Sequence, residues 1–143
     1  SVLFRFDDGS KGCFSVSQVS AGRKNRLHFD INASASSLSW DQENPQQLWI
    51  GKRSQANQWL SDDPSLLNRD VAGQAHFPGG HSEGWPDAFK NMMLNFYQAV
   101  EAGKMPEARE RRFASFSEGA NVMYIIDAIV KSHQQRRWVS VEQ

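Results

Sequence analysis

The chain has 143 residues, 39% of them hydrophobic and 11% aromatic, which suits one globular domain with its own apolar core. Its 16 basic and 16 acidic side chains cancel, so no global field favours nucleic acid or a membrane, and we expect neither as a partner. No stretch approaches the roughly 18 apolar residues that cross a bilayer, and the single Cys13 cannot form an internal disulfide. We therefore expect a cytoplasmic protein.

Alternating apolar and polar residues in the first part of the chain predict an antiparallel sheet. Residues 2–6 and 14–17 flank a turn and indicate a β-hairpin. The same alternation recurs at 27–32, 38–40 and 47–51, and 58–60 adds a shorter piece. Five strands joined by short turns predict a meander with one apolar and one polar face. We expect the polar face to pair with another copy of the chain through Ser15, Ser17, His28, Asp30, Asn32 and Trp49.

The middle of the chain predicts a shaped loop followed by a helix. Residues 61–74 are polar and aperiodic, as in a surface connection. A glycine-rich stretch at 76–84 then leads into a helix that Pro86 and Asp87 open and Gly103 ends. The apolar side chains of this helix recur at steps of three and four, which predicts a buried stripe of Trp85, Phe89, Met92, Met93, Phe96, Tyr97 and Val100.

A charged linker and a second helix follow. Residues 104–112 carry three arginines, which we interpret as a solvated face rather than a phosphate-binding patch. Ser115, with Glu118 three residues further on, has the spacing of a capping box. The second helix has an apolar stripe within 122–130, and residues 138–141 alternate as a last strand. These elements predict an α+β fold in two layers, with a largely antiparallel open sheet and helices packed on one face.

Histidine and carboxylate side chains gather in the glycine-rich stretch. His81 beside Glu83 could serve general acid/base work or hold a polyol hydroxyl; the competing interpretation is a loop histidine that caps backbone groups. His76 lies at the outer edge of the stretch, and we expect its replacement to be nearly silent. The glycines leave ligand geometry unspecified and no fourth ligand is evident, so we expect no metal site. Arg23 and Lys24 could meet an anionic or polyhydroxy ligand, although two basic residues at a turn are usually solvated.

Four stretches resemble the C-terminal domain of the glucose-fructose oxidoreductase, inositol dehydrogenase and rhizopine-catabolism (Gfo/Idh/MocA) family. They are residues 27–41, the loop 80–89 that reads GHSEGWPDAF, residues 116–120 and the tail 132–141. Together they extend over nearly the whole chain, and the loop is the most specific of them. In that family an N-terminal Rossmann domain binds NAD or NADP. The C-terminal domain supplies an open sheet, one wall of the substrate site and the surface used for oligomerisation.

The resemblance implies that residues 1–143 form the single substrate-side and oligomerisation domain of an NAD(P)-dependent oxidoreductase that acts on a sugar, inositol or related polyol. It implies that His81 lines the substrate cleft, that Trp85 holds the loop on the sheet, and that Arg23 or Lys24 lies nearby. The family's glycine fingerprint, its Glu-Lys-Pro motif with the catalytic lysine and its Asp-x-Gly-x-His helix would all precede Ser1. We therefore expect this fragment to hold no catalytic residue and no cofactor site, and to be inactive alone.

A second class of protein stays open at this point, namely a free-standing α+β binding or interaction module without redox activity. The chain starts at Ser1 inside a strand pattern and without an initiator methionine, as an excised fragment would. An upstream strand, G-x-G-x-x-G motif and helix in the parent gene would support the oxidoreductase. A start codon just before Ser1 would support the module.

Overall fold

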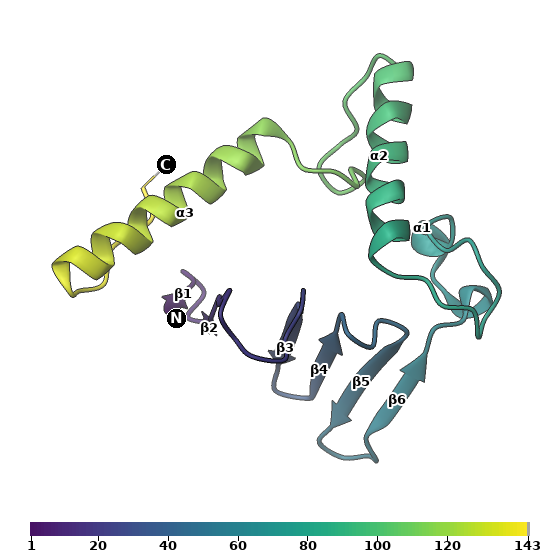
Figure 1. The fold of residues 1–143 in the computed structure, drawn as a ribbon, viewed down its shortest axis with the longest axis horizontal. Helices are drawn as coiled ribbons and strands as arrows, with labels where there is room; N and C mark the ends of the chain where they lie inside the picture. The colour runs from purple at the N-terminus through teal and green to yellow at the C-terminus, as the bar shows by residue number, and fades with distance from the viewer. Residues whose placement is uncertain (143) are drawn as a thin grey trace. The chain divides into compact units, whose positions relative to one another are not determined.

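The computed structural model describes residues 1–142 and confirms the α+β class with antiparallel sheets. The chain divides into two compact units. The first consists of Ser1–Gly22 and Ala114–Gln143, and the second consists of Arg23–Phe113. Six strands, one 3-10 helix and three α-helices make up the described part (Figure 1). None of these helices is both long and apolar enough to cross a bilayer.

The first unit begins with the predicted hairpin. Strand β1 (Val2–Arg5) pairs antiparallel with β2 (Lys11–Phe14), and Gly9 takes the left-handed conformation that the turn requires, with φ of 85°. Phe4 lies opposite Gly12, and its ring covers that glycine so closely that a Cβ there would overlap it. The hairpin forms a two-stranded sheet of its own, so the predicted five-stranded meander is wrong in this respect.

Helix α3 (Phe116–Gln135) begins where the capping box predicts. The amide of Ser115 donates to the Glu118 carboxylate at 2.7 Å, and the amide of Glu118 donates back to Ser115 Oγ at 3.2 Å. The helix ends at Arg136, a non-glycine residue with φ of 52°. The last strand predicted at 138–141 does not form, because this segment has no hydrogen-bonded partner strand among residues 1–142. Instead, the Arg5 guanidinium lies 4.4 Å from the centre of the Trp138 ring.

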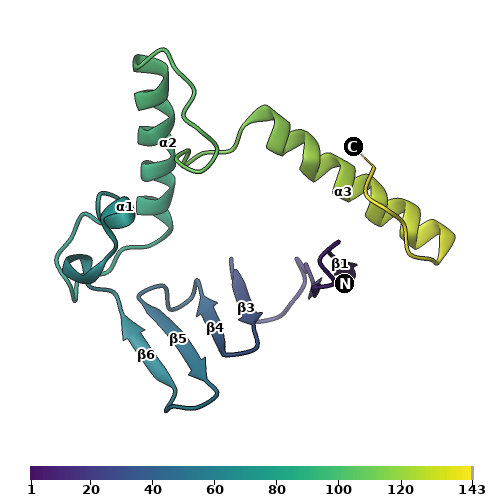
Figure 2. The same cartoon turned by 180° about the vertical axis from the view of Figure 1, so that it is seen from behind.

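The second unit holds a four-stranded antiparallel sheet. Its strands are β3 (His28–Asn32), β4 (Ser36–Asp41), β5 (Gln47–Lys52) and β6 (Gln58–Ser61). They lie side by side in chain order, as Figures 1 and 2 show from opposite directions. Each strand is short and joined to the next by a tight connection, so the alternation of side chains in the sequence translates directly into two faces.

The strand register confirms the split into an apolar and a polar face. One face carries the apolar residues Phe29, Ile31, Leu38, Trp40, Leu48, Ile50 and Leu60. The other carries His28, Asp30, Asn32, Ser37, Ser39, Trp49 and Trp59. Trp49 and Trp59 are direct cross-strand partners, so the polar face presents two indole rings. Ser15 and Ser17, which we had expected on this face, follow β2 in the other unit and are no part of the sheet.

Two short helical turns connect the sheet to helix α2. They are η1 (Pro64–Leu66) and α1 (Arg69–Ala72), and they lie in a stretch predicted as a plain surface connection. Asp63 caps η1 and Asn68 caps α1, each through its side-chain oxygen and the amide two residues on. Local side-chain caps therefore form helical turns where the apolar pattern had indicated none.

Helix α2 (Trp85–Glu101) has the predicted start and stop. Gly84 is its N-cap, Pro86 lies in the first turn, and Gly103 follows the helix with φ of 62°. The apolar stripe is present, but its side chains remain 37% to 65% exposed. The expectation that this stripe is buried is therefore wrong for the chain by itself. Among the described hydrophobic residues only Ala128 is buried, so residues 1–142 leave most of their large apolar side chains exposed.

Candidate functional site

The glycine-rich loop, residues 76–84, turns sharply at its centre. Gly80 takes a left-handed conformation with φ of 84°, and the amide of His81 donates to the carbonyl of Pro78 at 3.2 Å. The turn exposes the His81 side chain. The loop therefore presents one imidazole at its tip.

The imidazole of His81 also contacts the backbone of its own turn. Its Nδ1 lies 3.2 Å from the Pro78 carbonyl oxygen, which is the backbone-capping contact of the competing interpretation. A carbonyl oxygen can only accept, so Nδ1 must carry the proton in this contact. In a neutral imidazole Nε2 is then the acceptor, and it has no hydrogen-bond partner within residues 1–142. Capping by Nδ1 thus leaves Nε2 able to accept from a ligand hydroxyl.

Glu83 fastens the loop in two directions. Its carboxylate Oε1 accepts from the amide of His76 at 2.8 Å, which joins the two ends of the loop. Its backbone carbonyl accepts from the side-chain amide of Gln46, which lies directly before β5. One residue therefore closes the loop and attaches it to the sheet at the start of β5.

Asn91 on α2 fastens the start of the loop. Its Nδ2 donates to the carbonyl of Gln74 at 2.6 Å, which identifies Oδ1 as the acceptor of the amide. That Oδ1 lies 2.6 Å from Nε2 of His76, which must then be the protonated nitrogen. Asn95, one helical turn further on, donates to Oε1 of Gln74 at 3.0 Å. His76, at the outer edge of the loop, is thus anchored through both its ring and its backbone amide.

The end of the loop is fixed by the first turn of α2. The Gly84 amide donates to the Asp87 carboxylate at 3.1 Å, which satisfies a helix N-terminal donor. Trp85 stacks on Phe89, with ring centres 5.5 Å apart and an angle of 14° between the ring planes. Trp85 therefore packs along its own helix and is 59% exposed.

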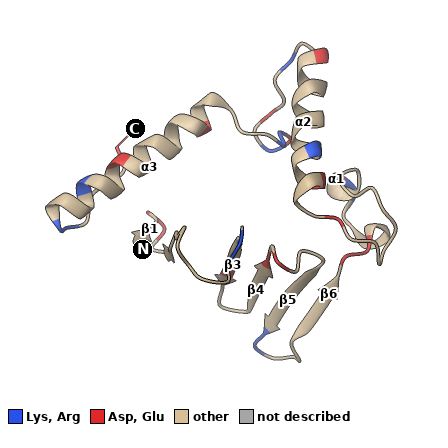
Figure 3. Ribbon diagram, in the orientation of Figure 1, with Lys and Arg blue, Asp and Glu red and all other residues tan. Residues whose placement is uncertain are grey.

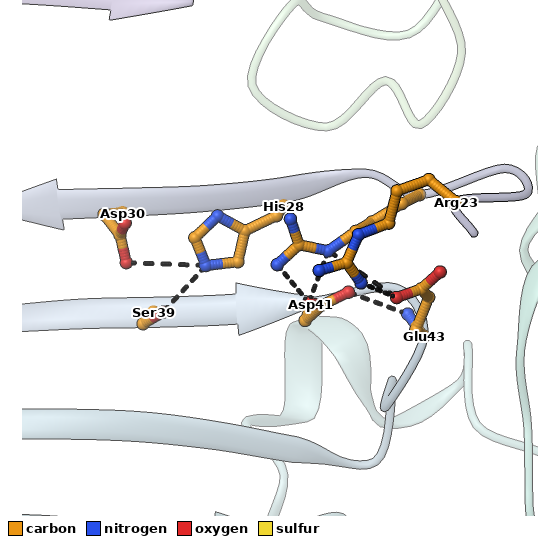
Figure 4. A network of polar contacts seen from close by, with 7 residues as sticks. Arg23, His28, Asp30, Ser39, Asp41 and Glu43 are labelled. Carbon is orange, nitrogen blue, oxygen red and sulfur yellow. Dashed lines mark hydrogen bonds and ion pairs between the residues drawn. The ribbon is translucent and has the colours of Figure 1, made fainter. Parts of the chain in front are cut away.

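Arg23 and Lys24 are not brought to the loop by any contact in the described part of the chain. Arg23 instead donates to the Glu43 carboxylate at 2.7 Å (Figure 4). Lys24 is exposed near the start of the second unit, before β3. Sequence reasoning had passed over Arg26, which holds the carboxylate of Asp41 through two hydrogen bonds of 2.6 and 2.8 Å.

The contact between Arg26 and Asp41 shifts the pKa of each residue in the direction that favours its charged form. The hydrogen bond from Arg26, helped by the Glu43 amide, lowers the pKa of Asp41 below its usual range. The same contact with Asp41 raises the pKa of Arg26. Nearby, Nε2 of His28 lies 3.3 Å from Ser39 Oγ and 3.7 Å from a carboxylate oxygen of Asp30 (Figure 4). The polar groups at this corner are therefore joined to one another by hydrogen bonds and ion pairs.

A polar hollow of about 620 Å³ lies beside the Asn91–Asn95 side of α2. It is lined by Asp70, Gln74, Asn95, Arg109, Glu110 and Arg112. Arg112 donates to the Asp70 carbonyl at 3.3 Å, and Arg109 lies 3.7 Å from the Glu110 carboxylate. Both signs of charge also occur on α2 and α3 (Figure 3). Of the three linker arginines, Arg109 and Arg112 are exposed, which fits the interpretation of a solvated face. Residues 1–142 contain no group of three or more potential metal ligands.

An antiparallel sheet, a loop attached to it at the start of β5, and a helix that begins at that loop make up an α+β domain. The family described as "Oxidoreductase family, C-terminal alpha/beta domain" (GFO_IDH_MocA_C) matches residues 2–141. The chain belongs to this family. No curated protein sequence matched the chain.

Solved structures of similar fold support this assignment. An oxidoreductase from Sinorhizobium meliloti is 26% identical with a TM-score of 0.83, and the match covers 96% of this chain and 39% of that one. An inositol dehydrogenase homolog from Azotobacter vinelandii, complexed with NADH and myo-inositol, is 28% identical with a TM-score of 0.64 over 71% of this chain and 27% of that one. Levoglucosan dehydrogenase is 23% identical with a TM-score of 0.79 over 99% of this chain and 37% of that one, a likeness of fold alone. The chain therefore spans less than half the length of these structures.

Proposed function

We propose that the chain is the substrate-side domain of an NAD(P)-dependent oxidoreductase that acts on a sugar, inositol or related polyol. The family match over residues 2–141 carries this proposal. The Azotobacter structure, which holds NADH and myo-inositol, supports the polyol class. A fixed loop that presents a hydrogen-bond acceptor on His81 fits a ligand rich in hydroxyl groups.

The nicotinamide cofactor belongs, in this proposal, to an N-terminal Rossmann domain outside these 143 residues. When bound, it supplies the hydride acceptor for oxidation of a carbinol. The residues of this chain do not fit a dinucleotide, because the sequence contains no G-x-G-x-x-G and its glycine-rich loop does not connect a strand directly to a helix. The chain's own contribution is to bind and orient the substrate.

His81 is the residue that we propose for substrate contact. Its Nε2 is an acceptor in the neutral tautomer that the Pro78 contact selects. One hydrogen bond to a substrate hydroxyl would both bind and orient the sugar ring. Three other residues remain weaker candidates: Trp85 stacks on Phe89, Arg23 binds Glu43, and Lys24 is exposed in the segment before the sheet.

The polar face of the sheet is the surface that we propose for pairing with a second copy. Trp59 is 65% exposed there, beside its cross-strand partner Trp49. An exposed indole on an otherwise polar face is typical of the buried centre of an interface, and two-fold pairing is the commonest way to cover it. We also propose a cytoplasmic location, for which the single unpaired Cys13 is supporting evidence.

The test is turnover by the full-length enzyme. We expect reduction of NAD or NADP with myo-inositol or with one member of a panel of monosaccharides and polyols. Failure of every polyol with both cofactors, in a correctly folded preparation, would contradict the proposed function. A crystal structure with the active polyol would then test contact with His81 directly.

A further inference from the structure

Glu83 lies two residues from His81, so its carboxylate is the obvious acid/base partner for that imidazole. The observed contacts point elsewhere. Oε1 of Glu83 accepts from the His76 amide at 2.8 Å, and within residues 1–142 no hydrogen bond or ion pair joins it to His81. We propose that Glu83 is a positioning residue: it holds the glycine-rich loop closed so that His81 meets the substrate, and it exchanges no proton in the reaction.

The position of Glu83 in the loop suits this role. The contact with His76 spans seven residues, so it closes the loop at its base, and the turn at Gly80 lies between the two joined residues. A charged carboxylate that accepts from a backbone amide forms one of the stronger hydrogen bonds available to a loop. The carbonyl of the same residue accepts from Gln46, so the closed base is also attached to the sheet at the start of β5. The loop has two arms, the residues before and after the turn at Gly80. Loss of the carboxylate would break the hydrogen bond that joins them at the base.

Asn91 holds only one arm of the loop, the residues that precede the turn at Gly80. Asn91 binds both the ring of His76 and the carbonyl of Gln74, so the incoming arm is held by α2. The outgoing arm enters the first turn of α2 through Gly84 and Asp87. Apart from the contact of His81 with Pro78 at the turn, Glu83 is the one side chain in the described residues that directly joins the two arms. It therefore decides how far the arms separate, and with them how often His81 is in a competent position.

The proposal rests on the proposed function of His81 and can be separated from it by two variants of Glu83 in the full-length enzyme. Glu83→Gln keeps an oxygen that can accept from the His76 amide but cannot exchange a proton at neutral pH. Glu83→Ala removes the acceptor. A less populated competent loop raises the apparent dissociation constant in proportion, so the loss should appear mainly in KM.

We expect Glu83→Gln to stay within about 3-fold of wild type in kcat/KM and Glu83→Ala to lose about 10-fold, mostly through KM. The pH profile of kcat/KM should keep its ionisations in Glu83→Gln, because the carboxylate contributes none. Equal damage by the two variants, or an ionisation missing in Glu83→Gln, would overturn the positioning role and support proton transfer. Glu101→Gln, an exposed glutamate at the far end of α2, serves as the matched control.

Hydrogen exchange in the same full-length protein provides a readout that is independent of activity. The His76 amide should exchange faster in Glu83→Ala than in wild type, with Glu83→Gln close to wild type. Unchanged exchange in Glu83→Ala would overturn the closure. If His81→Ala lowers kcat/KM while Glu83→Ala does not, the positioning role fails and the proposed function stands. If exchange at His76 rises in Glu83→Ala but His81→Ala has normal kinetics, the closure is supported and the proposed role of His81 fails.

Discussion

Nε2 of His76 lies 2.6 Å from Oδ1 of Asn91, fifteen residues further along the chain, and this contact ties the start of the glycine-rich loop to helix α2. The polarity of the contact is determined by the other end of the asparagine, which donates to the Gln74 carbonyl. The loop that carries His81 is thus held by side chains from three places: Gln46 just before β5, Glu83 within the loop and Asn91 on the helix.

Replacement of Asn91 should loosen the loop. Asn91→Ala removes the donor to the half-buried Gln74 and the acceptor of the exposed His76, and we expect a loss of about 1 to 2 kcal/mol in the free energy of unfolding. Thermal or denaturant unfolding measures it, and Gln98→Ala on the exposed side of α2 is the control. His76→Ala should also destabilise, by about 1 kcal/mol. An unfolding curve of Asn91→Ala that overlays wild type would contradict this account.

Replacement of His81 should reduce activity and leave stability unchanged. In the full-length enzyme, His81→Ala should lower kcat/KM by about 10-fold or more, the value of one hydrogen bond of ~1.4 kcal/mol. The melting temperature should not change, because the side chain is exposed and contacts only its own turn. Ser82→Ala, next to it in the loop, is the matched control. Wild-type kinetics for His81→Ala would reduce this histidine to its backbone-capping contact.

The Arg26–Asp41 pair should make stability depend on acid pH. The folded-state pKa of Asp41 is lowered, so its contribution is present above about pH 3.9, the ordinary pKa of an aspartate, and is lost as pH falls through the folded value. Arg26→Gln should therefore be less stable than wild type near pH 7, and this difference should shrink in acid. Denaturant midpoints across pH measure the effect, and Asp41→Asn in both backgrounds isolates the pair. A difference that stays constant down to pH 3 would refute the assignment.

The polar sheet face should control oligomeric state. Trp59→Lys places a charge where the proposed interface needs an exposed indole, so the full-length enzyme should shift to a smaller species in light scattering. Lys52→Ala, on the opposite face of β5, should leave the mass unchanged. A wild-type enzyme that is monomeric at high concentration, or a Trp59→Lys variant of unchanged mass, would count against the pairing.

The 143-residue chain by itself should oxidise no sugar or polyol with either nicotinamide cofactor. The reason is chemical, since its residues provide neither a dinucleotide cradle nor the family's lysine motif. Absorbance of the reduced nicotinamide is the measurement. Turnover by the pure chain, at a rate proportional to its concentration, would show that a catalytic group lies within these residues.

The sequence by itself determined the elements whose causes are local. Strands β3 to β5 follow from the alternation of side chains, and the register then separates Phe29 from Asp30 across the sheet. Helix α3 begins at Ser115 because its cap partner is only three residues away, and α2 ends before Gly103 because that position needs a positive φ. The family could also be recognised from the loop and the strands, because its motifs are contiguous in the chain.

Only the tertiary structure decided which groups share the site. Glu83 and His81 are two residues apart in sequence, yet the carboxylate of Glu83 binds His76, and Asn91 and Gln46 gave no sequence signal beyond ordinary polar residues. The same holds for the separate hairpin, the missing strand at 138–141 and the exposed stripe of α2. Periodicity and caps act over one turn or one strand, whereas pairing and burial depend on the surface that meets each element, and that surface comes from residues far along the chain or outside it.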